Sequence, residues 1–120
     1  MKLNALFYLV LFVLMPVTAV SGDFPQGTFT LTMGKSEFVL TFIDDSSYAI
    51  KLIGQFEVDG TYGASGDTLN INDKPGEGSC PSSGMYVWKY ENKKLMFKSL
   101  SDGCAERAQV MNAGPWILRE

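Results

Sequence analysis

The sequence predicts an all-β protein, an eight-stranded antiparallel up-and-down barrel with one short helix between strands seven and eight. Three observations lead to this prediction. Apolar and polar residues alternate along most of the chain after residue 27. Short polar or glycine-containing turns separate the alternating segments. A pattern with glycine two residues before an aromatic recurs at Gly27, Gly60 and Gly84, which indicates successive hairpins built to one plan.

The first four expected strands each place an apolar residue at every second position. They span 28–33, 38–42, 48–53 and 56–62. Their apolar faces are formed, in order, by Phe29, Leu31 and Met33; Phe38, Leu40 and Phe42; Tyr48, Ile50 and Leu52; and Phe56, Val58 and Tyr62. Polar or glycine-containing turns at 34–36, 44–47 and 54–55 separate them.

The second half of the chain continues this alternation and adds one helix. Strands are expected around 69–71, 86–90, 95–98 and 115–119, with apolar faces formed by Leu69, Ile71, Tyr86, Trp88, Tyr90, Leu95 and Phe97. A loop rich in Gly, Pro and Ser occupies 73–84. A helix is expected over 103–112, because helix-forming residues follow Asp102, which suits an N-cap, and Gly114 and Pro115 end the helix.

Eight strands of this kind can close into a barrel or stack as a sandwich. The short, regular turns favour the up-and-down barrel, and closure also removes exposed strand edges. The interior of an eight-stranded barrel is just wide enough to be filled by side chains or to hold one small ligand.

The N-terminus has the three-part layout of a secretory signal peptide. Lys2 gives a positive start, an unbroken apolar run extends from Ala5 to Met15, and Pro16 and small residues follow. The run is too short for a membrane-spanning helix, which needs about 20 residues. We therefore predict a signal peptide over 1–19, with cleavage after Ala19 or as late as residue 22, and a barrel domain over 23–120. The protein is expected to be secreted or periplasmic, with no stable membrane anchor.

Export determines how the two cysteines are interpreted. In an oxidising compartment Cys80 and Cys104 are expected to form a disulfide, worth roughly 3–4 kcal/mol on the chain-entropy model. A redox-active pair would usually have the closer C-x-x-C spacing.

Composition excludes several functions. The chain has no histidine and two cysteines, which rules out His-based catalytic triads, four-thiolate zinc sites and iron–sulfur clusters. Ten basic and thirteen acidic residues give a net charge of −3, so no nucleic-acid partner is expected. The aspartates at 44, 45, 67 and 73 are interpreted as ordinary turn residues. We expect neither a cofactor nor a metal, and we do not expect an enzyme.

A set of positions in the second half resembles the small secreted bacterial lipocalin-like domains of the calycin type. The residues that carry the resemblance are Gly60, Tyr62, Gly66, Asp67, Leu69, Cys80, Gly84, Tyr86, Trp88, Leu95, Phe97, Asp102, Cys104, Arg107 and Trp116. The resemblance implies a secreted, disulfide-linked barrel that binds small apolar ligands. One departure is that larger lipocalins begin with Gly-x-Trp, whereas this chain has Phe29 at that position.

Aromatic residues on the inward face are the candidate ligand-binding wall, because they combine apolar area with a few polar groups. These candidates are Phe29, Phe38, Tyr48, Phe56, Tyr62, Tyr86, Trp88, Tyr90 and Phe97. The alternative is that these side chains simply fill the barrel. Asp102, Arg107 and Trp116 are interpreted as structural, with Arg107 pairing with a carboxylate or stacking on a ring such as Trp116 rather than binding an anion.

Two functions follow from these alternatives. The first is an exported barrel that holds an apolar or amphipathic small molecule in its aromatic-lined interior. The second is an inhibitor or protein-binding module with a filled barrel, which presents the 73–84 loop to a protein target.

Overall fold

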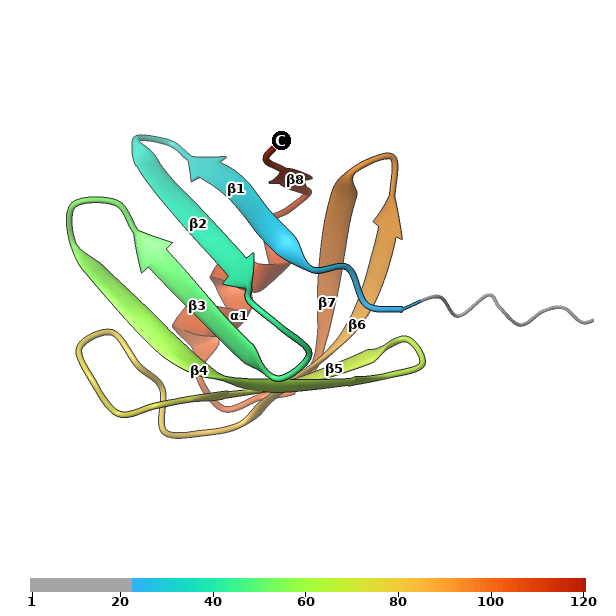
Figure 1. Ribbon diagram of the computed structural model, residues 1–120. Helices are drawn as coiled ribbons and strands as arrows, with labels where there is room; N and C mark the ends of the chain where they lie inside the picture. The colour runs from blue at the N-terminus through green and yellow to red at the C-terminus, as the bar shows by residue number, and fades with distance from the viewer. Residues whose placement is uncertain (1–22) are drawn as a thin grey trace, which may run out of the picture.

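Eight antiparallel strands form a closed barrel, with one helix before the last strand (Figure 1). The computed structural model describes residues 23–120; the predicted signal peptide and its cleavage site lie outside these residues. The elements are β1 (Gly27–Met33), β2 (Ser36–Phe42), β3 (Ser47–Leu52), β4 (Phe56–Ser65), β5 (Thr68–Asp73), β6 (Gly84–Glu91), β7 (Lys94–Asp102), α1 (Ala105–Asn112) and β8 (Trp116–Leu118). The predicted fold class is confirmed.

The short strand β8 closes the barrel. It pairs with β7 through Leu95 and Trp116, and with β1 through Phe29 and Leu118. Every other strand pairs with its neighbours in sequence, as expected for an up-and-down meander.

Several strands are longer than the sequence predicts, because strand pairing continues into the flanking residues, and the extensions of β4 and β7 are the two that matter most here. Ser65 pairs with Thr68, so β4 continues past residue 62, where the strand was expected to end, and only two residues connect it to β5. Strand β7 extends to Asp102, which pairs with Gly84 at the start of β6. This extension fixes the position of the Asp102 carboxylate.

The barrel interior is largely filled by aromatic and aliphatic side chains. The buried cluster consists of Phe29, Leu31, Phe38, Leu40, Phe42, Tyr48, Tyr62, Leu69, Ile71, Tyr86, Leu95, Phe97, Met111 and Trp116. Most residues of the predicted inward face are buried here, as alternation along the strands requires. Tyr90 is 36% exposed near the end of β6, and Ile50, Leu52, Phe56 and Trp88 are half-buried.

The helix α1 begins after Cys104, which is its N-cap residue, so the prediction of Asp102 as the N-cap is wrong. Asp102 is the last residue of β7 and instead accepts a hydrogen bond from the Cys104 amide at 2.8 Å. At the other end of α1, the Trp116 indole donates to the Met111 carbonyl at 3.3 Å. Within residues 23–120, no helix is both long and apolar enough to span a membrane.

The predicted disulfide is present. It joins Cys80, in the loop between β5 and β6, to Cys104 at the start of α1, with their Cα atoms 6.1 Å apart. The disulfide therefore ties the long loop to the helix.

Gly60 in β4 marks a close approach inside the barrel. A Cβ atom at this position would lie 2.3 Å from the Asn72 carbonyl and 2.6 Å from the ring of Tyr48, the residue that pairs with Gly60 on β3. The Tyr48 ring therefore occupies the space that a side chain would need. Gly63, on the same strand, has no neighbouring atom within 4 Å of its Cβ position.

Gly60→Ala should lower the free energy of unfolding by about 1–3 kcal/mol, because the added methyl group forces the Tyr48 ring or the β5 backbone to move. Gly63→Ala is the matched control and should be neutral or stabilising by up to about 1 kcal/mol. Urea denaturation of both variants measures the difference. Equal effects of the two substitutions would contradict the packing of Tyr48 over Gly60.

Candidate functional site

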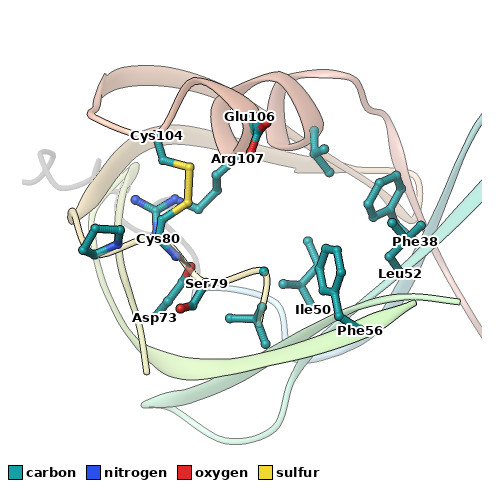
Figure 2. A pocket seen from close by; sticks show the side chains of 14 residues that line it. Phe38, Ile50, Leu52, Phe56, Asp73, Ser79, Cys80, Cys104, Glu106 and Arg107 are labelled. Atoms are coloured by element: carbon teal, nitrogen blue, oxygen red, sulfur yellow. Dashed lines mark hydrogen bonds and ion pairs between the residues drawn. A yellow bond between two sulfur atoms is a disulfide. The ribbon is translucent and has the colours of Figure 1, made fainter. Parts of the chain in front are cut away.

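A cavity of about 310 Å³ lies between α1, the strands β2 to β4 and the loop that carries Cys80 (Figure 2). One side of the cavity is apolar. It is formed by Phe38, Ile50, Leu52, Phe56, Val58 and, from α1, Val110. This volume is at the lower end of the roughly 300–1,000 Å³ typical of small-molecule sites.

The opposite side of the cavity is polar and lies beside the disulfide (Figure 2). Asp73 and Arg107 provide charged side chains there, and Glu106 lies on the wall formed by α1. Residues 78–81 of the loop complete this side. The cavity therefore has an apolar end and a charged end, which is the arrangement that an amphipathic molecule requires.

Arg107 is the central group of the charged end, and its side chain is only 7% exposed. Its Nε atom donates to Asp102 Oδ2 at 2.9 Å, and its Nη2 atom donates to Asp102 Oδ1 at 2.8 Å. Nη2 also donates to the Ser82 carbonyl at 2.6 Å. This bidentate contact is the strong, geometrically specific form of an arginine–carboxylate pair.

The second carboxylate on Arg107 is Asp73, whose Oδ2 lies 3.2 Å from Arg107 Nη1. The contact is an ion pair without hydrogen-bond geometry, and Nη1 has no hydrogen-bond partner among residues 23–120. The side chains of Asp73 and Asp102 are 3% and 0% exposed. Arg107 is thus neutralised by two buried carboxylates, one held tightly and one more loosely.

The two carboxylates are held in the same way. Tyr48 donates its hydroxyl proton to Asp73, and Tyr86 donates its own to Asp102. The Cys80 amide donates to Asp73 Oδ2 and the Cys104 amide donates to Asp102 Oδ1, both at 2.8 Å. Two Tyr–Asp–Cys units therefore meet at Arg107, and the disulfide joins their cysteines. We call these seven residues the Arg107 network.

Gly84 provides the space that the Arg107 network needs. A Cβ atom there would lie 2.7 Å from Asp102 Oδ2 and 3.1 Å from Arg107 Nη2. Gly60 and Gly84 therefore each leave room for a tyrosine of the Arg107 network. The Tyr48 ring lies over Gly60, and the Tyr86 ring lies 3.0 Å from the Cβ position of Gly84.

The network fixes the ionisation states of its members. Burial lowers the pKa of Arg107, but the carboxylates of Asp102 and Asp73 outweigh burial and raise this pKa above its ordinary value. Burial raises the pKa of Asp102, but the hydrogen bonds from Arg107, Tyr86 and the Cys104 amide outweigh it and hold this pKa below 3.8. Burial first, and then the neighbouring aspartates, raise the pKa values of Tyr48 and Tyr86. At neutral pH both tyrosines are therefore uncharged donors.

The structure separates the nine predicted wall residues into two groups. Phe38 and Phe56 line the cavity. Phe29, Tyr48, Tyr62, Tyr86 and Phe97 belong to the buried cluster and do not line it. Trp88 and Tyr90 also lie away from it. The candidate site therefore uses β2, β3 and β4 rather than the aromatic run of β6.

Trp88, in β6, packs instead in an aromatic cluster around Phe24, a residue that precedes the first strand. Phe24 lies with its ring centroid 5.0 Å from that of Trp88 and 4.7 Å from that of Phe42. The Tyr62 ring completes the group at 5.5 Å from Phe24. Phe24 precedes β1, so the segment before the first strand closes this part of the interior.

Several site residues are not apparent from the sequence. The interpretation of Asp73 as an ordinary turn residue is wrong, because Asp73 is buried at the end of β5 and paired with Arg107. The aliphatic lining residues Ile50, Leu52 and Val58 are predicted to face inward, but their pattern does not indicate a site.

The ionisable groups of the Arg107 network have fixed roles as donors and acceptors. Tyr48, Tyr86, Asp102 and Arg107 each keep one ionisation state at neutral pH, because their pKa values are displaced away from neutrality. Within residues 23–120, no group of three or more potential metal ligands lies together.

Comparisons of the chain with protein-family models, with curated proteins and with solved structures gave no match. The eight-stranded antiparallel barrel is compatible with a calycin-like fold.

The pKa of Asp102 gives the pH dependence of stability a definite sign. As the pH falls, the unfolded protein takes up a proton at Asp102 before the folded protein does. The stabilisation from the Asp102 carboxylate is fully present at pH values above its ordinary pKa of 3.8. It is lost as the pH falls through the lower pKa that Asp102 has in the folded protein. Asp102→Asn should therefore lower the free energy of unfolding at pH 7 by roughly 3–5 kcal/mol, because Arg107 loses its main partner. The difference from the wild type should shrink below about pH 4.

Urea denaturation at several pH values measures this effect. Asp45→Asn is the control, since Asp45 is exposed in the turn between β2 and β3, and it should leave stability nearly unchanged. A difference between wild type and Asp102→Asn that stays constant down to pH 2 would contradict the assigned ionisation of Asp102.

Proposed function

We propose that the protein is an exported binding protein that holds one small amphipathic molecule in the cavity between α1 and β2–β4. The observation that carries this proposal is the cavity itself, with one apolar side and one charged side. A barrel that acts only as a scaffold gains stability from being filled, because voids cost packing contacts. An open volume of about 310 Å³ beside an otherwise packed core is therefore suited to a ligand.

The position of the long loop favours ligand binding over the alternative of an inhibitor. An inhibitory loop would project from a filled barrel. In this protein Gly78, Ser79, Cys80 and Pro81 form part of the cavity wall, and the disulfide holds the loop against α1. The loop is thus engaged in building the site.

Export and membership of the lipocalin-like group are parts of the same proposal. A disulfide between Cys80 and Cys104 fits an oxidising compartment. The closed barrel fits the fold that the resemblance in the sequence implies. Fold alone does not establish a function, so the ligand class has to be argued from the cavity.

A titration with 1-hexanol tests the proposal, because this molecule combines an apolar chain with a small polar head. Saturable shifts are expected in the methyl NMR signals of Ile50, Leu52 and Val58, which line the cavity. The methyl signals of Ile43 and Ile117, which are 60% and 42% exposed, should not move.

A pair of α1 variants provides the control. Val110→Phe places extra bulk in the cavity and should weaken hexanol binding by at least about tenfold. Gln109→Phe adds the same bulk at an exposed position of α1 and should leave binding unchanged. If hexanol shifts no cavity methyl group in the wild type, the proposed function is wrong.

A further inference from the structure

The charges at the polar end of the cavity do not balance. Asp73 and Asp102 are two buried carboxylates, and Arg107 is the one buried cation between them. Tyr48 and Tyr86 remain uncharged at neutral pH, because their pKa values are raised. The Arg107 network as a whole therefore carries a net negative charge.

The surroundings of the network do not reverse this sign. The N-terminus of α1 adds a partial positive charge of about half a unit. Glu106, on the cavity wall, adds a full negative charge and has no ion-pair partner within the described part of the chain. The polar end of the cavity thus has a negative potential.

The carboxylate that faces the cavity is also the one that Arg107 neutralises less. Asp102 receives two hydrogen bonds from the guanidinium at 2.8 and 2.9 Å and does not line the cavity. Asp73 lines the cavity and has only the 3.2 Å ion-pair contact with Nη1. Asp73 also accepts hydrogen bonds from the Tyr48 hydroxyl and the Cys80 amide, but these neutral donors carry no positive charge. A ligand head group at this end therefore meets a carboxylate whose charge Arg107 compensates only in part.

Building on the proposed function, we propose that the ligand is a small amphipathic amine, with its protonated nitrogen between Asp73 and Glu106 and its apolar body against Phe38, Leu52 and Phe56. The cavity is expected to reject carboxylates of the same size. An anion that reached the unpartnered Arg107 Nη1 would lie beside Asp73 Oδ2, because these two atoms are 3.2 Å apart. Repulsion from that carboxylate in a poorly solvated site would offset the attraction of the guanidinium.

Three probes with the same six-carbon chain test the charge preference: hexylammonium, 1-hexanol and hexanoate. Their dissociation constants at pH 7 come from the methyl signals of the cavity residues. Hexylammonium should bind most tightly, and hexanoate should bind at least about tenfold more weakly than hexylammonium, a ratio that a modest electrostatic difference in a partly buried site can produce.

Two matched variants separate the local charge from the overall charge of the protein. Glu106→Gln removes a negative charge at the cavity wall and should reduce the ratio of hexylammonium to hexanoate affinity several-fold. Glu57→Gln removes one on the outer face of β4 and should leave the ratio unchanged.

The outcomes distinguish this inference from the proposed function. If hexanol binds in the cavity but hexanoate binds as tightly as hexylammonium or more tightly, the amine proposal is wrong and the binding function stands. A ratio that responds equally to both glutamate variants would also overturn the amine proposal, because the preference would then come from the whole surface. If none of the three probes shifts the cavity methyl signals, both proposals fail.

Discussion

The guanidinium of Arg107, held between the carboxylates of Asp73 and Asp102, is the interaction on which the site depends. A cation buried this deeply is tolerated only when its charge is compensated and its donors are largely satisfied. The barrel provides this compensation from the ends of two strands, since Asp73 ends β5 and Asp102 ends β7. Removing Arg107 would leave two buried carboxylates uncompensated, and removing Asp102 would take away the bidentate partner of the guanidinium, so these residues are coupled to one another rather than independent.

The same interaction explains why a cavity persists beside a packed core. Each aspartate also binds the amide of one cysteine, so the network and the disulfide together fix the 78–81 segment and the start of α1. These two elements form one side of the cavity, and β2 to β4 form the other. The helix is therefore held away from the strands by its attachment at one end, and Val110 faces open volume instead of filling it. Rigid charged groups on one side and aliphatic side chains on the other then give the site its amphipathic character.

The sequence predicts the barrel well because alternation is a local property that each strand displays by itself. Phe29, Leu31, Leu40 and Leu69 have positions in the core that follow directly from period-two patterning. The pairing of Cys80 with Cys104 also follows, since only one intramolecular pairing exists. The site is less predictable because it depends on contacts between distant elements. Nothing local to Asp73 distinguishes it from a turn aspartate, and its burial depends on Arg107, which lies on the far side of the 74–103 segment. The aromatic run of β6 misdirected the site prediction for a related reason, since alternation shows which residues face inward but not where the interior is left open.

The hydrogen exchange of the Arg107 side chain tests the central claim most directly. The chain has two arginines, Arg107 in the network and the exposed Arg119, so a single NMR spectrum of the Nε–H groups contains its own control. If Asp102 accepts the Nε–H of Arg107 in a buried network, this signal stays sharp and exchanges slowly at neutral pH, while that of Arg119 is broadened by exchange with water. Equal, rapid exchange of both signals would show that the Arg107 guanidinium is solvated, which would contradict a buried Arg107 network and the cavity wall that depends on it.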